Sequence, residues 1–110
     1  MSYFADRSGV TPRRAAGHDS YKLLSEKNGC VNGCFAGISV YNETEYNAPG
    51  VHEDQEGFVV LSGSGWAKVG DEEQLIEPGT TFIAPKNIPH VIKSLAADKP
   101  VTVFWFHAAV

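Results

Sequence analysis

Three side chains in the middle of the sequence have the types and spacing of metal ligands. His52 and Glu56 lie four residues apart, immediately before the apolar run Phe58–Leu61. Because side chains alternate along a strand, this even separation places both on one face. His90 begins a later run, after the turn at 85–89. Two imidazoles and a carboxylate are a ligand set for non-haem iron, zinc or manganese. A hydrogen-bonded structural role is the alternative for each histidine.

Short apolar or alternating runs between turn residues must position these side chains. The runs are Tyr21–Leu24, Cys34–Tyr41, Phe58–Leu61, Trp66–Val69, Leu75-Ile76, Thr80–Ala84, His90–Leu95 and Val101–Phe106. No segment keeps a helical period, and short strands at this spacing are typical of a β-barrel or sandwich. Gly and Pro interrupt the first residues. We therefore predict an extended N-terminal arm over residues 1–20 and an all-β domain over 21–110.

The composition limits the classes of partner. The 110 residues carry a formal net charge of −4, and the nine basic residues are scattered, which argues against a nucleic-acid partner. No apolar run approaches the roughly 20 residues of a membrane span, so no membrane partner is expected. The first residues contain no apolar signal-peptide core. We therefore expect a cytoplasmic protein.

Two spaced motifs resemble those of the cupin superfamily. The first cupin motif runs from a His-x-His pair to a Glu and then a Gly, and here it reads Gly50-Val51-His52-Glu53-Asp54-Gln55-Glu56, six residues, Gly63. The second runs from a Gly through Pro-x-Gly to a His and an Asn, and here it reads Gly79, five residues, Pro85-Lys86-Asn87, two residues, His90, three residues, Ser94. The resemblance implies a small single-domain cupin: one antiparallel β-barrel, or jelly roll, of six to eight strands. It also implies a divalent metal ion in the barrel mouth, held by His52, Glu56 and His90.

This sequence departs from the motifs at three positions. Gly50 stands where the first histidine belongs, so the usual fourth ligand is missing. Its loss either opens the metal to water and substrate or weakens the site until only a binding pocket remains. Asn87 replaces a turn glycine, and asparagine tolerates the left-handed conformation that such a turn needs. Ser94 replaces the terminal Asn.

Two further residues are candidates for a catalytic role. Asp54 shares the strand parity of His52, so it is either a substitute ligand or hydrogen-bond acceptor, or part of an exposed acidic turn. His107 lines the cavity if it continues the parity of Trp105, although a place in the solvent-exposed tail is the commoner fate. His18, next to Asp19, is interpreted as one of a surface pair.

Both faces of the last strand are apolar. Val101, Val103 and Trp105 lie on one face, and Phe104 and Phe106 on the other. A barrel strand normally has one face toward water, so the outer face needs a cover. The N-terminal arm is one candidate, and a second copy of the chain is the one we favour. We therefore expect a homodimer.

Cys30 and Cys34 flank a turn. If the loop is the two-residue turn Asn32-Gly33, the two thiols point to opposite faces. If it is a three-residue loop with Gly33 left-handed, they face each other and can form a disulfide. A cytosolic location favours free thiols.

These observations lead to two functional hypotheses. The first is a metal-dependent enzyme of isomerase, lyase or dioxygenase type, using iron, zinc, manganese or nickel on a small sugar or organic acid. The second is a non-catalytic module that binds a sugar or another metabolite. A storage or structural role for the metal is a weaker third.

Overall fold

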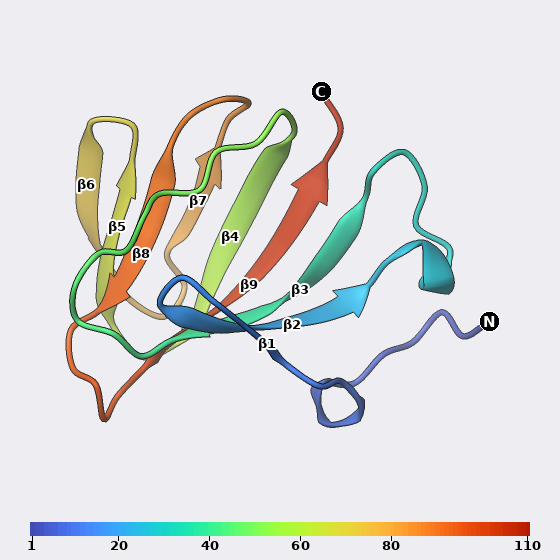
Figure 1. Cartoon of the computed structure of the whole chain (residues 1–110), viewed down its shortest axis with the longest axis horizontal. Helices are drawn as coiled ribbons and strands as arrows, with labels where there is room; N and C mark the ends of the chain where they lie inside the picture. Colours follow the sequence, from blue (N-terminus) through green and yellow to red (C-terminus); the bar gives the residue numbers. More distant parts are fainter.

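The fold is almost entirely antiparallel β-structure. The computed structural model describes residues 1–110 and contains nine strands and two 3-10 helices (Figure 1). The elements are η1 (Arg7–Gly9), β1 (Arg13–Ala15), β2 (His18–Leu24), η2 (Glu26–Asn28), β3 (Phe35–Tyr41), β4 (Gln55–Ser62), β5 (Gly65–Val69), β6 (Glu72–Ile76), β7 (Thr81–Ala84), β8 (His90–Ser94) and β9 (Val101–Ala108). Every predicted run coincides with a strand, which confirms the all-β prediction. No helix has the length and apolar character to span a membrane.

The strands form two sheets that pack as a jelly roll. One has the order β1-β2-β3-β9-β4-β7 and the other the order β6-β5-β8 (Figure 1). The two sheets do not join into a closed barrel, so the jelly-roll form of the prediction is the correct one. The two-residue loop Gly70-Asp71 connects β5 to β6, and Gly70 has the positive φ of 58° that glycine favours in such a turn.

Alternation along β4 and β9 builds the core. Val101, Val103 and Trp105 are at most 5% exposed and face inward, where they meet Phe58 and Val60 of β4. The second sheet completes this core with Ala67, Ile76 and Ile92. Burial of these apolar side chains is the main force that holds the two sheets together.

A glycine on β3 leaves room for the tryptophan of this core. A Cβ atom at Gly37 would lie 2.6 Å from the Trp105 ring and 2.1 Å from the Tyr21 carbonyl oxygen. The Trp105 Nε1–H donates a hydrogen bond of 2.8 Å to Ser39 Oγ. This bond satisfies the only polar group of a large buried ring.

The N-terminal segment extends the large sheet at its edge. Strand β1 pairs with β2, so the predicted boundary at residue 20 falls inside β2. Since β1 lies three strands away from β9, it leaves the outer face open. Leu61, Ile83 and Phe106 are 40–49% exposed there. The alternative that the arm covers this face is therefore wrong.

The cysteine turn is the two-residue form. Asn32 and Gly33 have φ of 55° and 76°, and Cys34 N–H donates to the Val31 carbonyl at 3.1 Å. Both thiols are free. They nevertheless contact each other, because residues 30–31 lie outside any strand and strand parity does not apply. The prediction of opposite faces was therefore wrong. Desolvation and the Cys34 contact raise the pKa of Cys30.

Candidate metal centre

Backbone hydrogen bonds bring the two sequence motifs together. Gly50 and His90 exchange two N–H···O=C bonds of 2.9 Å each. The N–H of Asn87 donates to the His52 carbonyl at 2.8 Å, and Asn87 adopts the predicted left-handed conformation with φ 62°. Segments almost 40 residues apart in the chain are thereby fixed side by side.

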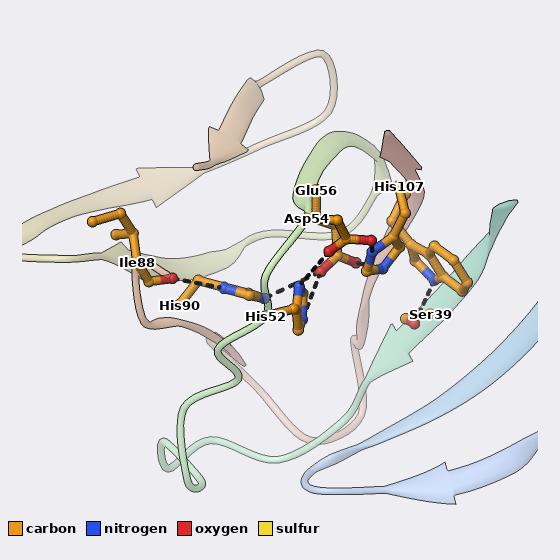
Figure 2. A network of polar contacts seen from close by, with 8 residues as sticks. Ser39, His52, Asp54, Glu56, Ile88, His90 and His107 are labelled. Atoms are coloured by element: carbon orange, nitrogen blue, oxygen red, sulfur yellow. Dashed lines mark hydrogen bonds and ion pairs between the residues drawn. The ribbon is translucent and has the colours of Figure 1, made fainter. Parts of the chain in front are cut away.

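Three donor atoms converge at this junction. The Nε2 atoms of His52 and His90 lie 3.4 and 3.1 Å from the same oxygen, Oε1 of Glu56 (Figure 2). The Nδ1–H of His90 donates to the Ile88 carbonyl at 3.3 Å, which leaves Nε2 directed at the junction. Glu56 lies on β4, and His52 lies in the loop before β4. His90 is the first residue of β8.

The second oxygen of Glu56 contacts a histidine on the last strand. Glu56 and His107 are directly opposite in the β4–β9 register, and Oε2 lies 3.3 Å from His107 Nε2. His107 is buried and stacks on Phe35 with ring centroids 4.1 Å apart. The expectation of a solvent-exposed tail for His107 was therefore wrong, because β9 extends to Ala108.

Asp54 closes a ring of ionisable side chains. Its Oδ2 accepts a hydrogen bond of 2.8 Å from His107 Nδ1, and its Oδ1 lies 3.3 Å from His52 Nδ1. That second contact lacks hydrogen-bond geometry, and Oδ1 is buried without a partner. The four residues His52, Glu56, His107 and Asp54 form a closed cycle of polar contacts, with His90 attached at Glu56 (Figure 2).

The pKa shifts follow from this cycle. Burial would raise the pKa of Glu56, but contacts with His107 and His90 outweigh it and lower the pKa to about 2. Burial would likewise lower the pKa of His107, but the carboxylates of Glu56 and Asp54 outweigh it and raise the pKa. Glu56 is thus held as a carboxylate, and His107 is stabilised as an imidazolium that donates from both nitrogens.

Gly50 lies directly beside the donor atoms. A Cβ atom at this position would lie 3.3 Å from His90 Nε2 and 3.7 Å from His52 Nε2. The donor set of His52, Glu56 and His90 suits a divalent metal ion, because its ligand atoms all lie within 4.8 Å of one another. A second group, His52, Asp54 and His107, has similar spacing.

The donor atoms lie in a cavity of about 560 Å³. Its lining includes Arg13 and His18, from the predicted N-terminal arm, and Lys22, from the predicted strand 21–24. The surface interpretation of His18 was wrong: its Nδ1–H donates to the Ala16 carbonyl at 2.9 Å, and its ring packs on Tyr41. Burial lowers the pKa of His18. Strand alternation is the sequence signal that could have placed His18 and Lys22 on the cavity side, because residues 18, 20 and 22 share one face of β2.

Comparison with known proteins identifies the family. The family model for the cupin domain matches residues 38–107, so the chain belongs to the cupins. No curated protein matches the chain.

Solved structures share the fold at low sequence identity. A predicted oxalate decarboxylase from Thermotoga maritima superposes with a TM-score of 0.82 at 15% identity, covering 96% of this chain and 98% of that one. The polyketide cyclase RemF from Streptomyces resistomycificus gives 0.79 at 18% identity, covering 97% and 79%. Iron(II)-containing HppE in complex with substrate gives 0.82 at 12% identity, covering 96% of this chain and 59% of HppE.

Proposed function

We propose that this protein is a metal-dependent enzyme that binds one divalent ion through His52, Glu56 and His90 and acts on a small polar molecule. The observation that carries the proposal is the convergence of three donor atoms from separate segments. The Nε2 atoms of His52 and His90 lie 3.4 and 3.1 Å from the third donor atom, Oε1 of Glu56. Iron, zinc, manganese and nickel all accept this ligand set. Iron in HppE, a structural relative, is consistent with it.

The surrounding residues would prepare the site for chemistry. The Ile88 carbonyl fixes the ring of His90, and Asp54 lies against the far nitrogen of His52. A bound ion would act as a Lewis acid on a substrate oxygen or activate a water molecule. His107 carries a proton on Nε2 at the cavity wall, and its Nδ1–H donates a hydrogen bond to Asp54. These two residues are our candidates for acid–base catalysis.

A non-catalytic binding module is the second candidate. It is favoured by the missing side chain at Gly50 and by the mutual pairing of Asp54 and His107, which occupies both candidate acid–base groups. Such a module would bind metal and ligand but would not turn any substrate over.

Metal content tests the first proposal. Protein purified without added metal should contain close to one equivalent by plasma mass spectrometry, and His90→Ala should contain almost none. His18→Ala is the matched control, because His18 lines the same cavity outside the donor group, and this variant should keep its metal. Equal metal content in both variants, or none in the parent, would contradict the proposal.

Turnover separates the two candidate functions. The metal-loaded protein would be incubated with diols, oxo acids and uronates, with and without oxygen and a reductant. Product formation that His90→Ala abolishes supports the enzyme. Saturable binding without any product supports the binding module.

We also propose that the exposed outer face joins two copies of the chain. Leu61, Ile83 and Phe106 lie there at 40–49% exposure, and burial of such a face is the usual reason for a sheet to be apolar on both sides. Sedimentation equilibrium should give a dimer at micromolar concentration, and Phe106→Glu should give a monomer. A monomeric parent would contradict this proposal.

A further inference from the structure

Two basic residues of the N-terminal strands line the metal cavity without an acidic partner. Arg13 of β1 is paired in register with Ser20 of β2, and Lys22 follows Ser20 by two residues. Side chains at such positions share one face of the sheet, and all three residues line the cavity. No ion pair in the structure involves Arg13 or Lys22.

The neighbouring arginine shows what a structural role looks like here. Arg14 lies on the opposite face of β1, where it pairs with Asp19 at 3.3 Å and Glu43 at 2.6 Å. Arg13 has no such partner and lines the cavity instead. The two adjacent arginines therefore differ in the groups available to satisfy their charge.

Lys22 contacts the aromatic ring that borders the polar cycle. Its ammonium lies 4.7 Å from the centroid of the Phe35 ring, and Phe35 stacks on His107. His107 in turn contacts Glu56. Because His107 stacks parallel to one face of the Phe35 ring, the Lys22 ammonium lies over the opposite face. Phe35 therefore stands between Lys22 and the candidate metal donors, and a ligand that contacts both must extend past this ring.

The charge balance of the cavity favours an anion. Glu56 is the only carboxylate among the lining residues. A divalent ion would more than neutralise that carboxylate, and Arg13 and Lys22 add two further positive charges. An unpaired positive field in a partly enclosed cavity attracts a negatively charged ligand.

We infer that Arg13 and Lys22 form the subsite for a carboxylate group of the substrate, which places small organic acids with a second, metal-binding oxygen ahead of neutral sugars. A carboxylate matches the planar fork of an arginine. An arginine fork also accepts a phosphate, so inorganic phosphate is the competing ligand in the test. The inference rests on the proposed function only in that the substrate's second oxygen would bind the metal ion. The carboxylate subsite itself consists of this chain's own side chains.

Calorimetric titration with dicarboxylates tests the subsite. Oxalate, malonate, succinate and glutarate would be titrated into zinc-loaded protein, together with neutral succinamide and inorganic phosphate. We expect at least one dicarboxylate to bind, and to bind more tightly than either succinamide or phosphate. Each of Arg13→Gln and Lys22→Gln should raise its Kd by about tenfold, the effect expected for loss of one charge-assisted hydrogen bond.

Matched controls separate the subsite from net charge. Arg14→Gln removes the same charge one residue away on the other face, and Lys68→Gln removes an exposed lysine outside the cavity. Both should bind the dicarboxylate as the parent does. Equal weakening by these controls, preference for phosphate, or failure of every dicarboxylate to bind would overturn the inference.

Zinc affinity distinguishes this inference from the proposed function. Arg13→Gln and Lys22→Gln should bind zinc alone like the parent, because neither residue belongs to the donor group. If zinc does not bind at all, the proposed function fails. In that case dicarboxylate binding to the metal-free protein still tests the subsite, and it should depend on Arg13 and Lys22 in the same way.

Discussion

The charge pairing of His107 can be tested by a double-mutant cycle in the metal-free protein. His107 lies between two carboxylates, 3.3 Å from Glu56 Oε2 and 2.8 Å from Asp54 Oδ2. His107→Ala removes the shared counter-charge and leaves both carboxylates close to each other. In an Asp54→Asn background only one carboxylate loses its partner, so the same substitution should cost less.

The magnitude follows from burial. Breaking a fully buried ion pair costs about 3–5 kcal/mol. Glu56 keeps its contact with His90, and Asp54 is 29% exposed, so both effects reduce this cost. We expect His107→Ala to lower the free energy of unfolding by about 2–3 kcal/mol, of which about 1–2 kcal/mol should be coupling to Asp54.

Urea unfolding of the four proteins at pH 6 measures this coupling. His18→Ala serves as a control for loss of an imidazole from the same cavity without a carboxylate contact. Additivity of the two substitutions within about 0.5 kcal/mol, the normal scatter for independent sites, would refute the pairing.

Three other perturbations have defined outcomes. Gly50→His should bind zinc about tenfold more tightly in a calorimetric titration, because its imidazole would add a fourth donor beside His52 and His90, whereas weaker binding would show that position 50 cannot supply a ligand. The lowered pKa of Glu56 stabilises the fold above its ordinary value of 4.5, and this stability should disappear as pH falls toward 2 in urea titrations, but not in Glu56→Gln. The raised pKa of His107 acts in the opposite sense, so its contribution is complete below 6.5 and is lost as pH rises through the folded-state value. Gly37→Ala should lower the free energy of unfolding by about 2–3 kcal/mol or prevent folding, while Gly9→Ala, with open space around it, should have no effect on the urea midpoint.

The strand pattern and the motif spacing predicted most of the fold. Alternation placed Val101, Val103 and Trp105 on one face of the last strand, and this face is the buried one. Strand β1 was missed, because its three residues form a strand only by pairing with β2 at the sheet edge. Edge strands of this kind depend on tertiary contacts more than on local pattern.

The sequence predicted only those residues of the candidate site that lie close together in the chain or belong to the two motifs. Parity placed His52, Asp54 and Glu56 on one side, and the motif added His90. The opposition of Glu56 and His107 comes from the β4–β9 register, which strand parity alone does not specify. The contribution of Arg13 and Lys22 to the cavity likewise required the pairing of β1 with β2.

The position of a bound metal ion tests the central claim most directly. A crystal of the zinc-loaded protein measured at the zinc absorption edge should show one anomalous peak between His52 Nε2, Glu56 Oε1 and His90 Nε2. A peak at the second donor group, made by His52 with Asp54 and His107, would contradict the assignment, as would the absence of any peak in the cavity.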